Sequence, residues 1–183
     1  GRHPIIWTIV LGLTETATSF FLMNSKADEG KILSQKKIKV SKEDNAKSLY
    51  NKISIQACKQ IRLFVPNFIN GSLKVKKQST KVGNIWRKRT FDDGVIDWRM
   101  NFKAIENLVK ALSPPYPGAS CFYNGKYYKI LKISKGKKIS NNIEPGKILN
   151  VSKNKITVKC WDYSVNILQH SFSKKPKKGE YLC

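Results

Sequence analysis

Apolar and polar positions follow two different periods along the first 40 residues. Residues 5–11 are mainly apolar and predict a short helix, whereas the β-branched and aromatic run at 18–23 predicts a strand. Residues 32–40 alternate between apolar and polar and predict a second strand. A polar loop over residues 24–30, which ends in a glycine, would connect these two strands.

The clearest element of the chain is a long amphipathic helix. Apolar side chains recur every three or four residues from Ala46 to Phe68, which is the spacing of one helix face. Ser41 can cap the start of this helix, and the acidic residues that follow it favour the positive end of the helix dipole. Pro66 is expected to kink or end the helix, and Asn70-Gly71 would close it.

The pattern changes to short strands in the second half of the chain. Residues 104–112 predict a short helix, which the proline-rich stretch 114–118 ends. Asn124-Gly125 lies between two aromatic-rich runs and therefore predicts a β-hairpin. Further strands are expected at 148–151, 156–161 and 165–169. Short strands at such regular spacing are typical of a small barrel-like β domain.

These elements predict an α/β part followed by a β-rich part. We assign residues 1–72 to the first part, and residues 89–183 to a second part with one leading helix. Residues 73–88 are basic and weakly patterned, so we interpret them as the linker. The longest apolar stretch, residues 4–13, is too short and too interrupted to cross a bilayer, and no membrane span is expected.

The chain is strongly basic, with 35 Lys and Arg against 12 Asp and Glu, which gives a net charge of +23. Such a field attracts RNA, nucleotide-linked substrates, polyglutamylated folate or an anionic membrane surface. Only 5 of the basic residues are Arg, whose planar fork suits phosphate groups and bases better than Lys does. The charge therefore leaves two interpretations open, a polyanion surface or an ordinary solvated lysine surface.

The four cysteines, Cys58, Cys121, Cys160 and Cys183, are widely separated, and only two histidines could assist them. This spacing does not fit a zinc site, so no metal is expected. Cys58 falls in a helical pattern and Cys160 in a strand pattern, which predicts that both are small buried side chains. Reduced thiols are typical of the cytoplasm, and we expect that location.

Five local strings carry more information than the periodicity does. In order along the chain they are Gly1-Arg2-His3-Pro4-Ile5 with Trp7, Thr14–Ser19, Ala27–Leu33, Arg89–Trp98 and Pro115–Ala119. This ordered set resembles the 10-formyltetrahydrofolate-dependent formyltransferases, the family that includes methionyl-tRNA formyltransferase and the sugar N-formyltransferases. The resemblance extends over nearly the whole chain.

The resemblance implies the second part of a Rossmann-like formyltransferase domain, followed by a small OB-like barrel. It also implies 10-formyltetrahydrofolate as the formyl donor and a catalytic set of one Asn, one His and one Asp. Asp28 matches that aspartate. The Asn-x-His motif would lie immediately before Gly1, so we expect this chain to be inactive alone. His3 does not match the catalytic histidine, and we interpret it as a lone exposed side chain.

An aspartate suits the chemistry that the resemblance implies. Formyl transfer from a tertiary nitrogen to a primary amine passes through a tetrahedral oxyanion, and a proton moves from the amine to the folate nitrogen. A carboxylate next to an imidazole can orient it and stabilise its charged form. Without the resemblance, Asp28 would be interpreted as a turn former in a polar loop.

Two acceptors of the formyl group remain open. The Arg2, Pro4 and Trp7 string and the 89–93 string are more similar to the sugar enzymes, which favours a nucleotide-linked amino sugar, with Arg2 as a candidate substrate ligand. The positive charge would instead suit initiator tRNA and a methionyl-tRNA formyltransferase. Ala17 stands where the family usually has glycine, so the acceptor or folate environment is expected to differ.

Structural and non-enzymatic interpretations compete with the enzyme. Arg89 and the aspartates that follow it could form ion pairs at a domain junction, and Trp98 is expected to be a core side chain. The second part could also be a basic nucleic-acid-binding module, in which aromatic side chains stack on bases. The candidate aromatic and basic residues are Tyr123, Tyr127, Tyr128, Trp161, Lys126, Lys129 and Lys159.

Overall fold

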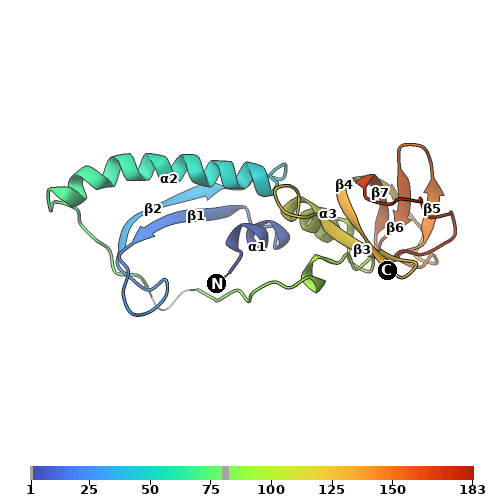
Figure 1. Cartoon of the computed structure of the whole chain (residues 1–183), viewed down its shortest axis with the longest axis horizontal. Coiled ribbons are helices and arrows are strands. Elements are labelled where there is room, and N and C mark those ends of the chain that lie inside the picture. The colour runs from blue at the N-terminus through green and yellow to red at the C-terminus, as the bar shows by residue number, and fades with distance from the viewer. Residues whose placement is uncertain (1, 80–82) are drawn as a thin grey trace.

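A long helix over a small sheet forms one end of the molecule, and a five-stranded sheet forms the other (Figure 1). This arrangement is seen in a computed structural model, which describes residues 2–79 and 83–183. The N-terminal helix α1 (Pro4–Val10) and the helix α3 (Phe102–Ala111) lie between the two ends and pack on each other (Figure 1). No helix in the described ranges is long and apolar enough to cross a membrane.

The small sheet pairs β1 (Glu15–Phe21) with β2 (Ile32–Lys39) in antiparallel register. The helix α2 (Ala46–Ile69) covers one face of this pair (Figure 1). Phe20 contacts Phe64 of α2, with ring centroids 5.1 Å apart. Along its other edge β1 has no strand partner among the described residues.

The strand β1 begins earlier and ends earlier than its β-branched and aromatic run predicted. Thr16 and Thr18 are half-buried on the α2 side, while Ala17 between them is exposed. This alternation is that of a strand with one covered face, so the polar residues Glu15 and Thr16 belong to the strand. The last apolar residues of the run lie outside the strand, which ends at Phe21, and Met23 is 92% exposed in the following loop.

The start of α2 differs from the prediction that Ser41 caps it. The cap is Asn45, whose side chain accepts a hydrogen bond from the Ser48 backbone N–H at 3.0 Å, while the Ser48 hydroxyl accepts from the Asn45 N–H. Ser41 lies one turn earlier, where its backbone N–H donates to the buried Asp44 at 2.8 Å. Burial raises the pKa of Asp44, but hydrogen bonds from Lys52, Ser41 and Ser48 outweigh it and lower the pKa overall.

Two further expectations for α2 need correction. Pro66 lies inside the helix rather than at its end, and the helix closes at Asn70 and Gly71 as predicted, where Gly71 has a φ of +73°. Pro66 lacks the N–H that would bond to the carbonyl four residues earlier, but the last helical turn still forms after it, because the Asn70 N–H donates to the Pro66 carbonyl. Cys58 is exposed rather than buried, because it faces away from the β1-β2 pair. Cys160 is buried, as predicted.

The five-stranded sheet is antiparallel, with the order β3-β4-β7-β6-β5. A β-rich second part is therefore confirmed, but the described strands do not close into the barrel that we expected, since β3 and β5 remain at opposite edges. A short 3-10 helix, Asp92–Gly94, precedes α3. The strands are β3 (Ala119–Tyr123), β4 (Lys126–Lys138), β5 (Ile148–Val151), β6 (Ile156–Lys159) and β7 (Tyr163–His170).

The predicted hairpin joins β3 to β4. Asn124 and Gly125 both have positive φ, at 46° and 76°, which the two central positions of a type I′ turn require. The strand β4 continues for 13 residues, to Lys138. It passes Ser164 of β7 at Gly136, where an added Cβ would lie only 2.2 Å from the Ser164 hydroxyl oxygen.

One continuous apolar core joins the two ends of the molecule. It includes Ile6 and Ile9 of α1, Ile105 and Leu108 of α3, and the inward side chains of the five-stranded sheet. Trp98 is only 3% exposed in this core, which confirms it as a core side chain. The two predicted parts therefore share buried surface through α1 and α3, and the boundaries that we assigned to them stay a prediction.

Candidate functional site

Asp28 lies in the loop between β1 and β2. Its backbone has a φ of +61°, in the left-handed region that Asp tolerates better than most residues. The residue is exposed, and within residues 2–79 and 83–183 its carboxylate has no hydrogen-bond partner. The backbone carbonyl of Asp28, by contrast, accepts a hydrogen bond from the Gln78 side chain at 2.8 Å. The loop is thus fixed by its backbone and presents the carboxylate outward.

The base of this loop is closed by a tight backbone approach. The Leu22 N–H donates to the Lys31 carbonyl at 2.9 Å, which continues the β1-β2 pairing past the end of β1. Gly30 is buried beside this bond, and an added Cβ would lie 1.5 Å from the Leu22 carbonyl oxygen. A glycine is therefore required two residues after Asp28, which gives a steric reason for the Asp-x-Gly string.

A segment from beyond α2 completes the loop from the other side. Ile32 and Lys76 exchange two backbone hydrogen bonds of 2.7 and 2.9 Å, so the chain pairs with the outer edge of β2. Two residues later, the Gln78 amide donates to the carbonyls of both Asp28 and Gly30, the second at 2.7 Å. The predicted linker thus contains residues that hold the candidate catalytic loop. No pattern in the sequence marks Gln78, because its partners are backbone atoms about 50 residues away.

A basic groove lies beside the loop, where this segment diverges from β2. The groove has a volume of about 590 Å³ and is open to solvent. Three lysines contribute to its wall, and Gln78 lies at the end nearest Asp28. A groove of this charge can accept carboxylate or phosphate groups. The lining residues are Ile32, Leu33, Ser34, Gln35, Lys74, Lys76, Lys77, Gln78 and Ser79.

Arg2 and His3 belong to a different cluster from Asp28. Arg2 is exposed, and its backbone N–H donates to the Trp86 carbonyl at 3.4 Å. His3 is half-buried rather than fully exposed as we expected, because its Nδ1 accepts a hydrogen bond from the Arg89 backbone N–H at 3.3 Å. It also has a φ of +59° at the start of α1. The bonded neighbours of Asp28 lie instead in the segment near Gln78.

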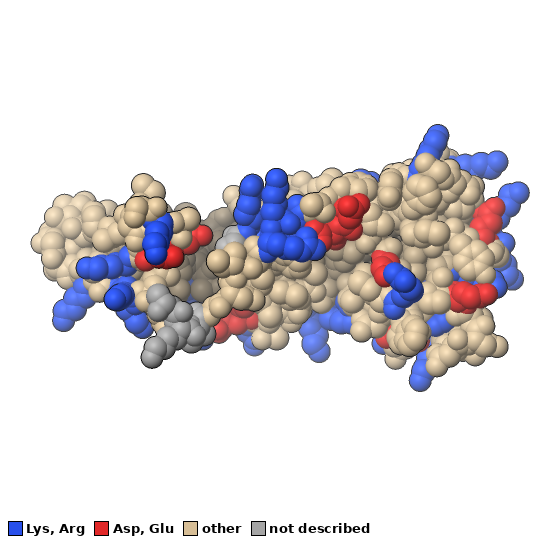
Figure 2. Space-filling view, turned by 90° about the horizontal axis from the view of Figure 1, so that it is seen from below, with Lys and Arg blue, Asp and Glu red and all other residues tan. Residues whose placement is uncertain are grey.

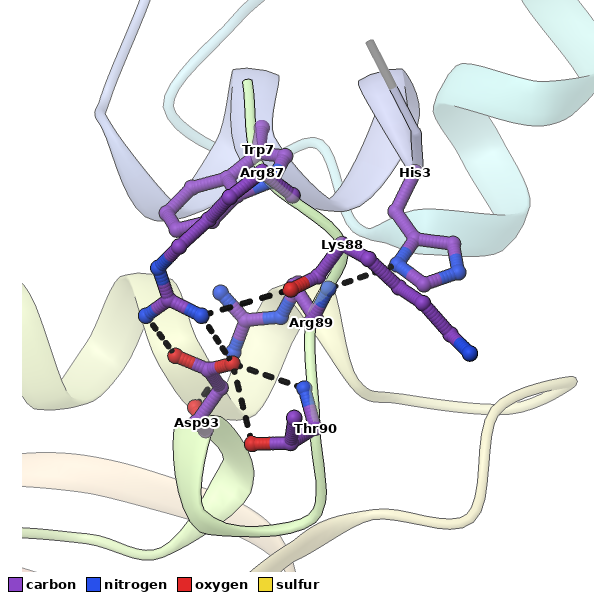
Figure 3. A network of polar contacts seen from close by, with 7 residues as sticks. All are labelled: His3, Trp7, Arg87, Lys88, Arg89, Thr90 and Asp93. Atoms are coloured by element: carbon purple, nitrogen blue, oxygen red, sulfur yellow. Dashed lines mark hydrogen bonds and ion pairs between the residues drawn. The ribbon is translucent and has the colours of Figure 1, made fainter.

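The junction around α1 is a network of cationic and aromatic side chains (Figure 3). The Trp7 indole N–H donates to the Arg87 carbonyl at 3.0 Å, and the guanidinium groups of Arg87 and Arg89 lie 5.5 and 4.8 Å from the indole centroid. Both guanidinium groups also bond to Asp93, Arg87 through the carboxylate and Arg89 through the backbone carbonyl. The ion pair of this junction is formed by Arg87 and Asp93, whereas Arg89, which we expected to form it, bonds to a backbone carbonyl.

Electrostatics at the junction follow from this geometry. Hydrogen bonding from Arg87, together with the Thr90 backbone N–H, holds the pKa of Asp93 well below its usual range, although burial opposes the shift. Burial lowers the pKa of the Arg89 guanidinium, which lies beside the Trp7 ring. Asp97 does not join this network but pairs locally with Arg99, with an N–O distance of 2.8 Å.

The aromatic residues proposed for base stacking do not form one platform. Tyr127 and Trp161 are 51% and 65% exposed, but Tyr128 packs on Phe172 with a centroid distance of 4.6 Å. Lys159 is only 1% exposed and donates to the carbonyls of Cys160 and Trp161. Its charge therefore does not face solvent.

The positive charge is spread over the molecule. Figure 2 shows Lys and Arg side chains along the whole length of the face seen from below, with acidic side chains next to several of them. In the described part of the chain, no cluster of His, Cys, Asp and Glu has an arrangement that could hold a metal ion. The Asp28 loop with its basic groove and the junction network are two places in the described chain where charged side chains meet a fixed backbone.

Solved structures share this fold. HypX from Aquifex aeolicus in complex with tetrahydrofolic acid is 20% identical over 96% of this chain and 30% of its own chain, with a TM-score of 0.71. The N-formyltransferase from Helicobacter canadensis in complex with folinic acid and dTDP-3-aminofucose is 16% identical, with 90% and 59% covered and a TM-score of 0.65. The present chain thus spans about a third of the first protein and less than two thirds of the second.

A third similar structure is an enzyme named for a different acceptor. Methionyl-tRNA formyltransferase from Clostridium thermocellum is 17% identical over 77% of this chain and 58% of its own, with a TM-score of 0.59. Identities this low establish the fold alone. The sequence family is established separately, because the family described as "Formyl transferase, C-terminal domain" matches residues 88–182, just over half of the chain. The chain therefore belongs to the formyl transferase C-terminal domain family.

Proposed function

We propose that this chain supplies the aspartate loop and the C-terminal domain of an enzyme that transfers a formyl group from 10-formyltetrahydrofolate to a primary amine. The observation that carries this proposal is the Asp28 loop, where a steric requirement for Gly30 and two hydrogen bonds from Gln78 fix the backbone and leave the carboxylate exposed. In a turn that merely reverses the chain, such a distant tie would be unnecessary.

The Asp28 carboxylate would act on a histidine of the Asn-x-His motif that the family resemblance implies. It would accept a hydrogen bond from the imidazole, fix its orientation and stabilise its protonated form. In the reaction, the amine nitrogen bonds to the formyl carbon, the bond from that carbon to folate N10 breaks, and the proton lost by the amine reaches N10. The described residues fit a folate, since its glutamate carboxylates can lie against the lysines of the groove.

We propose a nucleotide-linked amino sugar as the acceptor, with Arg2 as a substrate ligand. The similarity of the Arg2 and Arg89 strings to sugar enzymes supports this choice, and Arg2 is exposed at the junction. A methionyl-tRNA formyltransferase is the second candidate, which the net charge of +23 favours. A binding module for nucleic acid is the third, supported by the exposed Tyr127 and Trp161.

The proposed function also implies a fold for each part of the chain and a location in the cell. We infer that β1, β2 and α2 belong to a Rossmann-like domain whose other strands extend the sheet, and that the curved five-stranded sheet corresponds to the OB-like domain of the family. We also propose a cytoplasmic location, because the thiols of Cys58 and Cys183 are exposed and unpaired with each other, which suits a reducing compartment.

The test is an assay of the complete catalytic unit, in which this chain is joined to or supplied with the Asn-x-His segment. It is incubated with 10-formyltetrahydrofolate and either dTDP-linked amino sugars or Met-tRNA, and the formylated product is measured by mass spectrometry. Asp28→Asn is expected to reduce kcat by at least about 100-fold. Glu29→Gln, at the neighbouring exposed position, is the matched control and is expected to retain activity.

Each acceptor gives a distinct result. Turnover of amino sugars alone supports the first candidate, and turnover of Met-tRNA alone supports the second. Absence of turnover, together with steeply salt-dependent binding of single-stranded RNA that folate does not change, would contradict the enzyme and favour the binding module.

A further inference from the structure

We propose that Gln78 is a positioning residue, which holds the Asp28 loop in its working conformation. The inference rests on the proposed function of Asp28, but its structural part does not. Gln78 lies outside the strings that carry the family resemblance, in the stretch that the sequence assigned to a linker. It reaches the loop from the chain segment that follows α2.

The geometry gives one amide two acceptors. The Gln78 Nε2 lies 2.8 Å from the Asp28 carbonyl oxygen and 2.7 Å from the Gly30 carbonyl oxygen, so its two N–H groups can each make one hydrogen bond. With these carbonyls turned toward Gln78, the Asp28 backbone is held at its positive φ. The direction of the Asp28 side chain is set by that backbone conformation.

Gln78 is itself anchored. Two residues before it, Lys76 exchanges two backbone hydrogen bonds with Ile32, the first residue of β2. The antiparallel register thus brings residue 78 beside residue 30, and the Gln78 side chain makes the bonds that a backbone N–H would make in a continued strand. Because the segment is fixed to the edge of β2, the half-buried Gln78 amide holds the Asp28 loop at a fixed position relative to that strand.

The bonding pattern predicts which substitutions are tolerated. Gln78→Met keeps the length of the side chain but removes both donors, so the loop carbonyls lose their partners. Gln78→Lys keeps an extended side chain that ends in donors. A residue that merely filled space would tolerate Met at least as well as Lys, whereas a positioning donor would tolerate Lys better.

The experiment compares these two variants in the complete catalytic unit by steady-state kinetics and by amide hydrogen exchange of residues 27–31. Gln78→Met is expected to lower kcat about 10- to 100-fold with a smaller change in KM, and to accelerate exchange in the loop, while Gln78→Lys retains most of both properties. Gln169→Met is the matched control, because Gln169 is exposed on β7 and lines neither the groove nor the loop. This control is expected to leave loop exchange unchanged.

The outcomes separate this inference from the proposed function. If the wild-type unit transfers formyl groups and Asp28→Asn abolishes transfer, but Gln78→Met matches wild type in kcat and loop exchange, the inference is overturned. If the wild-type unit transfers no formyl group, the proposed function fails, and loop exchange in the Gln78 variants still decides whether Gln78 positions the loop. Equal losses in Gln78→Met and Gln78→Lys, with unchanged exchange, would also contradict it.

Discussion

The guanidinium of Arg89 lies 4.8 Å from the centre of the Trp7 indole, which joins α1 to the segment that leads into the five-stranded sheet. These residues are far apart in the sequence, and the His3 and Asp93 bonds on either side hold the same segment. Since a guanidinium stacks on an indole through both dispersion and electrostatics, the contact is selective for Arg over Lys. The junction is therefore held by specific contacts between α1 and this segment.

Loss of the Trp7 ring is expected to destabilise this junction. Trp7→Leu removes the surface on which two guanidinium groups lie and the indole donor to the Arg87 carbonyl. We expect the free energy of unfolding to fall by about 2 kcal/mol in denaturant titrations. The control is Trp161→Leu, since that side chain is 65% exposed. Equal losses in the two variants would contradict a special role for Trp7.

Acid stability should depend on Asp93. Hydrogen bonding from Arg87 lowers the pKa of Asp93 in the folded protein, so the stabilisation is complete above the unfolded pKa of about 4 and is lost as the pH falls toward the folded value. Asp93→Asn removes this contribution. We expect the variant to be less stable at pH 7 and to show a shallower decline in stability below pH 4, as measured by chemical unfolding at several pH values. A decline as steep as that of wild type would refute this assignment.

The first turn of α2 offers a test of the observed cap. Asn45→Ala removes the acceptor for the Ser48 N–H and should lower the free energy of unfolding by about 1 kcal/mol. Ser41→Ala should have little effect, because Ser41 contributes its backbone N–H to Asp44 rather than its side chain. Thermal or denaturant unfolding of both variants provides the measurement. A larger loss for Ser41→Ala would indicate that the helix begins earlier.

Gly30 should be hard to replace, because it lies at the tight base of the Asp28 loop. In Gly30→Ala the new methyl group would lie 1.5 Å from the Leu22 carbonyl, so the loop must move, and we expect a loss of about 3 kcal/mol or failure to fold. Gly71→Ala has open space around the added atom and should cost only about 1 kcal/mol for its positive φ. Circular dichroism and unfolding midpoints distinguish the two variants. A mild effect at Gly30 would contradict the tight approach.

Local periodicity was sufficient to predict most elements of the fold. The helix α2 and the hairpin at Asn124-Gly125 could be predicted because neighbouring residues encode each of them. The helix has an apolar stripe, and the hairpin has an Asn-Gly pair, which adopts the positive φ angles of a tight turn. The cap at Asn45 could not be distinguished from Ser41 by pattern alone, since both residues are good caps. The exposure of Cys58 depends on where the small sheet lies, which periodicity does not specify.

The candidate site likewise contains residues that a local string indicates and residues that only distant contacts reveal. Asp28 could be proposed as a site residue because its string with Gly30 resembles that of the family, and the structure supplies a steric reason for that glycine. Gln78 could not be identified, since it bonds to backbone carbonyls, and such partners leave no mark on residue types. The half-buried state of His3 likewise depends on Arg89, a contact between distant parts of the chain.

The unpaired edge of β1 has a consequence for how molecules of this protein behave together. Within the described chain that edge presents backbone donors and acceptors that no strand covers, and such an edge can pair with the same edge of another molecule. A net charge of +23 keeps the molecules apart at low ionic strength, but salt at physiological concentration screens charge beyond about 8 Å. For the isolated chain we therefore expect self-association through the β1 edge to increase as salt is added.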